Sequence, residues 1–348
     1  MSHYSQWLCD SENDSRPGIY FCKYISLCGC AVLLNNLTIS PFIMPHTAPI
    51  ILFVYNRLDH TRKTLEALQE NLLAEESDLY IYADAAKNQD AVDSVSRVRS
   101  YLLSVKGFRN IYIRLRETNL GVDQNVIGGV TEVINEKGRA IVLEDDLVTS
   151  PFFLKYMNEA LDFYENEEQV ISVHGYRYPV ETELKEVFFL KGADCWGWAT
   201  WKRGWDLMEL DGQKLLDRFA DEELKAEFNF DQSYPYMAAL EQQAAGDNDQ
   251  WDIRWYAAAF LAGKLTLYPG KSMVRNIGHD ASGTHCAESN IFDVELAQSE
   301  VNVEAELVPD QEAYLAFAGF LKKISDPGLQ RKRRFPLLSK MMRSLRSR

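Results

Sequence analysis

Three consecutive carboxylates, Glu144, Asp145 and Asp146, are the residues whose types and spacing most clearly predict chemistry in this chain. They follow residues 140–143, an apolar run with the composition of a buried strand. Adjacent acids repel one another, and beside an apolar core they stay ionised only if a cation compensates them. The simplest compensation is a divalent metal ion that also holds an anionic ligand such as a nucleoside diphosphate. The pattern therefore predicts a metal and diphosphate site.

The elements around these acids also indicate a binding position. Ser150 and Pro151 are typical of a helix N-cap and first turn, because Pro is tolerated where the amide would be unpaired anyway. The acids thus stand between a predicted strand and a predicted helix. In open α/β sheets, ligands bind beyond the carboxyl ends of the strands.

Strand and helix patterns alternate through the first half of the chain. This alternation predicts an α/β fold with a doubly wound, mostly parallel sheet. After Gly175 the sequence pattern changes. Four of the seven tryptophans lie within 196–205, and 206–245 has a helical pattern. This change predicts a smaller second lobe. The expected strands are 49–55, 79–83, 111–115, 140–143 and 170–173, and the expected helices are 58–73, 92–105, 123–135 and 152–164.

Charge is distributed unevenly over the 348 residues. The net charge is −14, although residues 322–348 hold ten of the 37 basic side chains and only one acid. The remaining body is strongly acidic, which excludes wrapping of nucleic acid, because that requires phosphate neutralisation. Residues 330–348 have the pattern of a short basic amphipathic helix suited to an anionic membrane surface. A disordered solubilising tail fits the same residues equally well.

The amino-terminal residues fit the predicted fold least. Residues 19–34 are apolar, but Lys23 interrupts them and they are too short for a membrane span. We expect residues 1–43 to be an extension outside the catalytic domain. None of the six cysteines forms a C-x-x-C pair, and free thiols in a reducing cytosol are the simplest interpretation.

Several segments together resemble nucleotide-sugar glycosyltransferases of the GT-A fold. The likeness is to the N-acetylglucosaminyltransferase I type and to bacterial, family 2-like enzymes of surface-polysaccharide synthesis, and it covers roughly residues 48–286. Its most specific piece resembles the acidic DxD-like motif of that family and the helix after it. The matching segments are Val142–Leu147 with Ser150–Phe153, Pro49–Arg57, Tyr82–Asp84, Gly197–Trp198 and Asp249–Trp251.

The resemblance implies roles for the strand ends. Asp146 would ligate Mn²⁺ or Mg²⁺, hard cations that prefer oxygen ligands, and Glu144 and Asp145 would face the ribose and sugar of the donor. Arg57 would contact the nucleotide, and Asp84 would accept the imide hydrogen of uracil. Purely structural roles remain open for each: a turn that caps the following helix, a surface ion pair for Arg57 and an Asx turn for Asp84.

The resemblance also implies a general base on the acceptor side. It places an acid just before a Trp-containing helix, and Asp249 matches best, with Asp252 as the rival and simple helix capping as the third alternative. The segment 277–285 is similar to a late loop that closes over the donor in that family. From this loop His285, or less readily His279, would touch phosphate or metal.

We therefore expect an inverting, metal-dependent glycosyltransferase that moves a sugar from a UDP-sugar to a carbohydrate or lipid-linked glycan acceptor. The expected location is cytoplasmic, with peripheral contact to the membrane through the basic tail. A sugar nucleotidyltransferase is the rival enzyme, although it normally needs a Gly-rich loop after the first strand. A non-catalytic carbohydrate-binding scaffold is the third alternative. The expected domain is 44–290, with a nucleotide half 44–174 and an acceptor half 175–290, and 291–329 is expected to pack on it.

Overall fold

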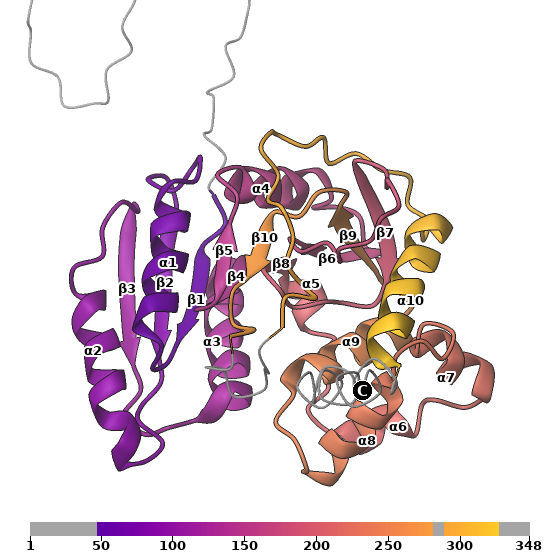
Figure 1. Cartoon of the computed structure of the whole chain (residues 1–348), viewed down its shortest axis with the longest axis horizontal. Helices are drawn as coiled ribbons and strands as arrows, with labels where there is room; N and C mark the ends of the chain where they lie inside the picture. Colours follow the sequence, from indigo (N-terminus) through magenta and orange to yellow (C-terminus); the bar gives the residue numbers. More distant parts are fainter. Residues whose placement is uncertain (1–46, 281–288, 327–348) are drawn as a thin grey trace, which may run out of the picture. The chain divides into compact units, whose positions relative to one another are not determined.

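An eight-stranded sheet in the order β3-β2-β1-β4-β8-β6-β9-β7 organises the chain (Figure 1). The computed structural model describes residues 47–280 and 289–326. A separate two-stranded sheet pairs β5 with β10. The strands are β1 (Ile50–Val54), β2 (Asp78–Ala83), β3 (Asn110–Leu115), β4 (Arg139–Glu144), β5 (Leu147–Thr149), β6 (Val170–His174), β7 (Val187–Lys191), β8 (Trp198–Trp201), β9 (Leu265–Pro269) and β10 (Val274–Asn276).

Helices connect most of these strands. A 3₁₀ turn, η1 (Gln89–Ala91), precedes the second helix. The α-helices are α1 (Leu58–Gln69), α2 (Val92–Leu102), α3 (Gly121–Lys137), α4 (Phe153–Phe163), α5 (Lys202–Trp205), α6 (Gly212–Leu216), α7 (Glu222–Phe228), α8 (Tyr236–Ala245), α9 (Trp251–Leu261) and α10 (Gln311–Ser325).

The strand directions confirm the predicted fold class. Strands β1 to β4 are parallel to one another, and β6 is parallel to β9. Strand β8 runs antiparallel to both β4 and β6, and β7 runs antiparallel to β9. Six of the eight strands therefore share one direction. This mostly parallel α/β sheet is consistent with a GT-A-type fold.

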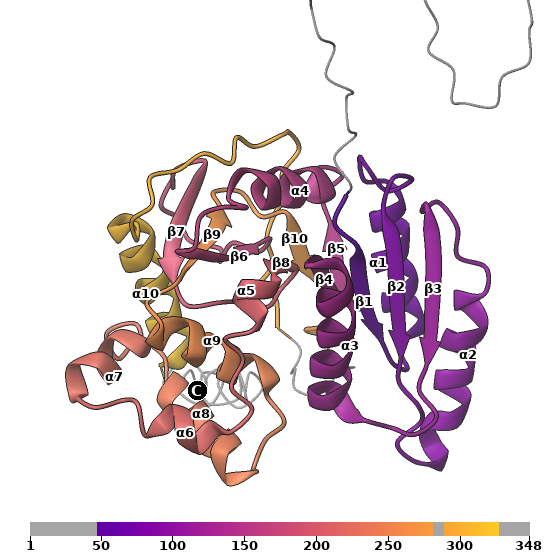
Figure 2. The same ribbon diagram turned by 180° about the vertical axis from the view of Figure 1, so that it is seen from behind.

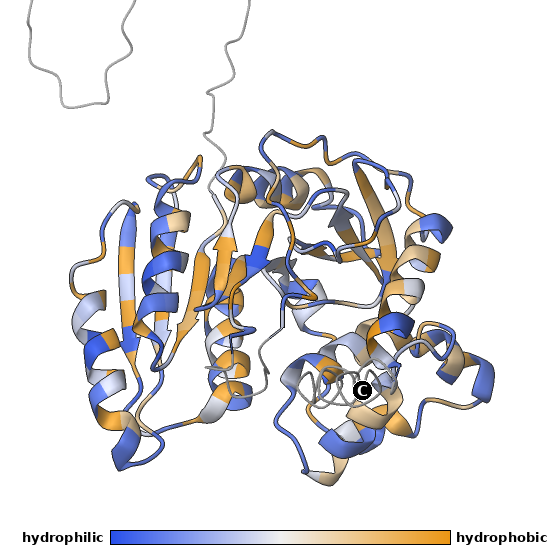
Figure 3. Cartoon of the chain, viewed as in Figure 1, coloured by the Kyte–Doolittle hydropathy of each residue, from blue (hydrophilic) through white to orange (hydrophobic). Residues whose placement is uncertain are grey.

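The two faces of the sheet have separate apolar cores because inward side chains alternate along the strands. Ile50 and Leu52 of β1 belong to the core that also contains residues of α1, α2 and α4. Ile51 and Phe53 belong to the core that contains residues of α3 and α9. Figures 1 and 2 show α1 and α2 on one face and α3 on the other, and Figure 3 shows the apolar character of β1 and β4. The sheet is thus doubly wound.

The second half of the domain combines strands with a group of helices. Side chains of α6, α7, α8 and α9 form one apolar cluster, and α10 packs with β7 and β9 in another. Strands β7, β8, β9 and β10 lie in a region where the sequence pattern predicts only helices and loops. Strand β8 carries the predicted tryptophan cluster into the sheet, and Trp198 is fully buried against Trp255.

Among the described residues, no helix is both long and apolar enough to cross a membrane. The predicted extension 1–43 and the predicted basic tail 330–348 lie outside the described residues.

Gly129 and Gly319 provide a matched test of how tightly α3 packs on the sheet. Alanine normally stabilises a helix interior by about 1 kcal/mol relative to glycine. A Cβ atom on Gly129 would lie 2.7 Å from Phe53 Cε1, whereas a Cβ atom on Gly319 in α10 would meet nothing within 4 Å. We expect Gly129→Ala to lower the free energy of unfolding by roughly 1–3 kcal/mol through overpacking and Gly319→Ala to raise it. Urea denaturation measures both, and equal effects of the two changes would contradict this packing.

Candidate active site

The carboxyl ends of β1, β2 and β4 bring most of the predicted site residues to one edge of the sheet. Strand β1 lies between the other two, with Val54 opposite Ala83 and Phe53 opposite Glu144. The residues that follow these strands therefore emerge side by side. The structure thus brings Arg57, Asp84 and the acids 144–146 to the same edge.

Arg57 is the basic side chain that pairs directly with these acids. It precedes α1, and its Nη2 donates hydrogen bonds to Asp145 Oδ1 and, at 2.8 Å, to Asp146 Oδ2. Burial lowers the pKa of Arg57, but the charges of the two aspartates raise it more, so its net pKa lies above the ordinary value. The guanidinium therefore stays charged and holds the end of β1 against the end of β4.

Asp145 is largely committed to the protein itself. Its side chain is only 6% exposed, and the Tyr55 amide donates to Oδ2 at 3.4 Å. The Thr64 hydroxyl donates to its main-chain carbonyl at 2.9 Å. Burial raises the pKa of the carboxyl and Arg57 lowers it by less. Asp145 therefore positions Arg57 and the backbone, and of these two aspartates Asp146 is the more accessible.

Glu144 is an acid without a direct partner. The structure gives its side chain no hydrogen bond or ion pair with any described residue. Burial raises the pKa of Glu144 to about 8, and the charges of Asp146, Asp252 and Asp145 raise it in the same direction, whereas Arg57 lowers it. Glu144 is consequently close to acids from β4 and from α9. This site favours a proton, a metal ion or another cation at Glu144.

The structure places the two predicted base candidates differently. Asp252 lies in the first turn of α9 and is partly buried, whereas Asp249 is exposed in the loop before that helix. The Cys195 thiol lies 3.7 Å from Asp252 Oδ2. Burial raises the pKa of Asp252, and the charge of Asp194 raises it further. Asp252 is thus the candidate in electrostatic contact with Glu144.

Asp84 has both carboxylate oxygens occupied by its own chain. Oδ1 accepts from the amides of Ala85 at 2.8 Å and Leu120 at 2.9 Å, and Oδ2 accepts from the Asn119 side chain at 2.9 Å and the Gly121 amide at 3.0 Å. The residue therefore ties the end of β2 to the start of α3. This observation favours the structural alternative that the sequence left open.

The chain after β10 lies directly over Asp146. The Ile277 amide donates to the Asp146 carbonyl at 2.8 Å, and His60 Nε2 lies 3.2 Å from the Ile277 carbonyl. A Cβ atom on Gly278 would be 2.1 Å from Asp146 Oδ2. Only glycine permits this approach, so the backbone of 277–278 forms a wall of the site.

His279 is the described histidine of this segment that faces the acids. Its ring lies 4.8 Å from that of Phe292 and 5.5 Å from that of Trp196, and its Nε2 is buried without a hydrogen-bond partner. Burial lowers the pKa of His279, and the charge of Asp146 raises it by less. The neutral ring retains a nitrogen that accepts a bond. His285, which the sequence favoured, lies outside the described residues.

The donor atoms at this edge fit a hard divalent cation that takes further ligands from phosphate and water. Within 47–280 and 289–326, no group of three His, Cys, Asp or Glu side chains forms a metal cage. Asp146 offers carboxylate oxygens, and His279, whose buried Nε2 has no hydrogen-bond partner among the described residues, lies within the electrostatic reach of Asp146. Mg²⁺ sites with substrate phosphates commonly use only one or two carboxylates. The donor atoms therefore fit a metal ion that is held jointly by the protein and by a bound phosphate ligand.

Sequence reasoning missed three residues beside Asp252. Asp194, Cys195 and His174 lie at the same sheet edge, because β8 runs antiparallel to β4 and β6 and pairs Trp198 with Val142 and His174. No local motif marks them in the sequence, and only the strand order reveals them.

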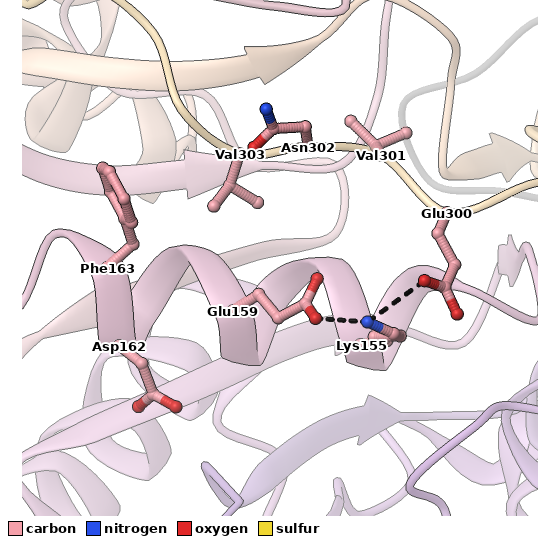
Figure 4. A pocket seen from close by; sticks show the side chains of 8 residues that line it. All are labelled: Lys155, Glu159, Asp162, Phe163, Glu300, Val301, Asn302 and Val303. Atoms are coloured by element: carbon pink, nitrogen blue, oxygen red, sulfur yellow. Dashed lines mark hydrogen bonds and ion pairs between the residues drawn. The ribbon is translucent and has the colours of Figure 1, made fainter.

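Two surface hollows lie away from this site. One, of about 710 Å³, lies between α4 and the segment 300–303 (Figure 4). Its Lys155 pairs with Glu159 and with Glu300 at 3.3 Å. A second, of about 350 Å³, lies between α2 and the ends of β2 and β3. Because the charged side chains of the first hollow largely satisfy one another, it has no evident ligand chemistry.

Glu144 gives a testable pH dependence. Its pKa is about 8 in the folded chain, whereas its ordinary value is 4.5. Between these two pH values Glu144 is therefore protonated in the folded chain and ionised in the unfolded chain. The stability that this proton provides is complete below the ordinary pKa and is lost as the pH rises toward 8. A chelator in the buffer removes metal ions. Under these conditions we expect Glu144→Gln to raise the melting temperature above that of wild type. This increase should be at least about 2 °C larger at high pH than at low pH.

The measurement is thermal unfolding at two pH values. The high pH is about one unit above the pKa of Glu144 in the folded chain, and the low pH is about one unit above its ordinary pKa. Glu117→Gln, at an exposed position, is the matched control and should show no such difference between the two pH values. A Glu144→Gln effect that is the same at both pH values would contradict the shifted titration.

The sequence matches no protein-family model and no curated protein. Among solved structures, the mannosyltransferase PcManGT from Pyrobaculum calidifontis, in complex with GDP-Man and Mn²⁺, is 11% identical over 39% of this chain and 37% of its own, with a TM-score of 0.28. TarS from S. aureus is 13% identical over 65% of this chain and 36% of its own, with a TM-score of 0.37.

A third neighbour is a putative nucleotide-diphospho-sugar transferase from Desulfovibrio desulfuricans G20. It is 13% identical over 37% of this chain and 58% of its own, with a TM-score of 0.27. This chain therefore spans less than two thirds of each neighbour's length. The N-acetylglucosaminyltransferase I type is not among these three neighbours. At these identities and TM-scores the neighbours identify no activity for this chain.

Proposed function

We propose that this protein is an inverting, metal-dependent glycosyltransferase that moves a sugar from a UDP-sugar to a hydroxyl group of a carbohydrate acceptor. The observation that carries the proposal is the arrangement around Glu144. Arg57 and Asp146 follow the adjacent strands β1 and β4, and Asp252 of α9 interacts electrostatically with Glu144 from the other side. A charged donor and a proton-accepting group can therefore meet at one edge of the sheet.

Donor binding is assigned to the β1 and β4 side. Arg57 is a permanent cation whose planar group suits phosphate oxygens. Asp146 and His279 are the residues that would hold Mn²⁺ or Mg²⁺ there. When bound, such an ion acts as a Lewis acid that stabilises negative charge on the departing diphosphate. We assign the late loop with His285 to the same phosphate side.

Neighbouring side chains orient the donor. Glu144 faces the sugar, because it lies between the metal-side acid and the acceptor-side acid. Asp145 acts through Arg57, which it holds in place. Asp84 holds the turn 119–121 beside the nucleotide position, and this rigid edge is where we place uracil.

The proton transfer is assigned to Asp252 rather than to Asp249. The acceptor oxygen forms a bond to the anomeric carbon while the bond from that carbon to the donor phosphate breaks, and the phosphate leaves with the electron pair. The acceptor proton passes to the Asp252 carboxylate. A carboxyl group with a raised pKa is the stronger base at neutral pH, and such a base contributes about 10²–10⁴-fold to the rate.

The acceptor class and location follow the sequence expectations. We propose a carbohydrate or lipid-linked glycan of surface-polysaccharide or lipopolysaccharide synthesis, and a cytoplasmic protein that meets the inner face of the membrane through residues 330–348. Liposome flotation of the full chain and of a variant without these residues tests the tail.

Asp146→Asn tests the metal and donor assignment. At about 100 times the dissociation constant, UDP with Mn²⁺ should stabilise the wild-type chain by about 2.7 kcal/mol. Asp146→Asn should lose the Mn²⁺-dependent part, because the metal loses its carboxylate. Thermal-shift titration with UDP and GDP, each with and without Mn²⁺, measures this, and Asp206→Asn, an exposed acid on α5, is the control.

Two results would contradict the metal and donor assignment. Wild-type protein that shows no Mn²⁺-dependent stabilisation would favour a scaffold. Stabilisation by GDP but not by UDP would overturn the UDP assignment.

Paired substitutions in the α9 region test the base. Hydrolysis of a panel of UDP-sugars, with water as acceptor, gives a rate before the natural acceptor is known. We expect Asp252→Asn to lower this rate by about 10² or more and Asp249→Asn to leave it close to wild type. Circular dichroism checks that both variants fold. A large loss in Asp249→Asn together with an unchanged Asp252→Asn would return the role to Asp249.

A further inference from the structure

Asp194 lies next to the proposed base, in the loop between β7 and β8. The Cys195 amide donates to Asp194 Oδ1 at 2.9 Å, while the Cys195 thiol lies 3.7 Å from Asp252 Oδ2. The Asp194 side chain is 26% exposed, so a ligand can reach it. Cys195 thus links the two carboxylates, and Asp252 in turn interacts electrostatically with Glu144.

Tyrosines from several elements surround Asp194. The Tyr178 hydroxyl donates to Asp194 Oδ2 at 3.3 Å. Burial raises the pKa of each surrounding tyrosine, and the charge of Asp194 raises it further, which places their phenol groups within its electrostatic reach. They come from the segment after β6, from α8, from α9 and from β9, and they are Tyr176, Tyr178, Tyr236, Tyr256 and Tyr268.

Ring contacts join several of these tyrosines to one another and to Trp196. Tyr236 and Tyr256 have ring centroids 5.0 Å apart. Tyr176 lies 5.5 Å from Tyr178 and 4.8 Å from Trp196, which also contacts His279 of the donor side. Aromatic faces attract cations through their quadrupole. The region therefore joins a carboxylate to aromatic rings next to the catalytic acids.

His174 is an unpartnered polar side chain aimed at this region. It is fully buried, and neither ring nitrogen has a hydrogen-bond partner. Its Nε2 lies 3.6 Å from Asp194 Oδ2, beyond a normal hydrogen bond. Burial lowers the pKa of His174, and the Asp194 charge raises it by less, so the neutral ring does not compensate the carboxylate.

Positive charge is missing on this side of the site. Within the described part of the chain, the neutral His174 is the only basic side chain within 4.0 Å of Asp194, and no ion pair involves Asp252 or Glu144. Acids of this kind normally pair with a cation. A bound ammonium group would supply both the charge and three hydrogen-bond donors, whereas a sugar hydroxyl supplies one donor and no charge.

We propose that Asp194 and its surrounding tyrosines bind a positively charged amino group of the acceptor, and so select an amino-bearing acceptor over its neutral analogue. This inference rests on the proposed function, because it places the acceptor beside Asp252. The ammonium group donates to Asp194 Oδ2 and lies against the tyrosine rings. A charge-assisted hydrogen bond of this kind is stronger than a neutral one.

Binding of three matched sugars to the full chain tests the proposal. The probes are glucosamine, glucose and N-acetylglucosamine, measured by isothermal titration calorimetry with UDP and Mn²⁺ present, at about pH 6.5 where the free amine is protonated. We expect glucosamine to bind about tenfold more tightly than either neutral sugar. Equal affinities in the wild-type protein would overturn the proposal, whether or not any variant folds.

Asp194→Asn should remove the preference for glucosamine, while binding of glucose and the Mn²⁺-dependent stabilisation by UDP stay unchanged. Asp194→Glu keeps the charge and should keep the preference, and Asp206→Asn, which removes an exposed charge elsewhere, should also keep it. A preference that persists in Asp194→Asn would overturn the role of Asp194. Absence of UDP stabilisation in the wild-type protein would instead overturn the proposed function, because donor binding is measured separately from the preference for glucosamine.

Discussion

Repulsion among the carboxylates at the end of β4 is the constraint on which the site depends. Glu144, Asp145 and Asp146 leave one buried strand together, and the described chain offers them a single close cation, Arg57, from the end of β1. That guanidinium joins two adjacent parallel strands and satisfies Asp145 almost completely. It leaves Glu144 without a partner, and burial then raises the pKa of Glu144 to about 8. An incompletely compensated site of this kind is what a metal ion or another cation would complete.

Strand β8 explains how the second half of the domain reaches these acids. An antiparallel strand between β4 and β6 begins at the edge where its neighbours end, so the residues before Trp198 lie beside the end of β4. Asp194 and Cys195 reach the site in this way, and α9 brings Asp252 to Cys195. The buried packing of Trp198 against Trp255 holds β8 and α9 together. A tryptophan cluster that could have stacked on sugars therefore serves mainly to position acids.

The sequence predicts the nucleotide half of the domain well because its information is local. Each buried parallel strand there is a continuous apolar run, and the polar residues that follow it mark the sheet edge. The convergence of Arg57, Asp84 and the three acids can therefore be predicted from the sequence. The other half depends on long-range pairing. Strands β7 and β8 run opposite to β9, and the choice between Asp249 and Asp252 depends on which residue begins the first turn of α9. Asp194 has no sequence motif, because only the strand order places it beside the base.

Under the proposed function, the resulting charge distribution separates the two substrates physically. On the β1 side a permanent cation attracts an anionic donor, whereas on the α9 side the carboxylates of Asp252 and Asp194 repel one. A diphosphate that entered the tyrosine-lined side would lie against two acids without compensation, which disfavours the reversed arrangement. A positively charged acceptor has the opposite preference, since Arg57 repels it and Asp194 attracts it. Because the charges of Arg57, Asp146 and Asp252 all act on Glu144, this residue is common to both sides, and the order of charges along the sheet edge orients both substrates.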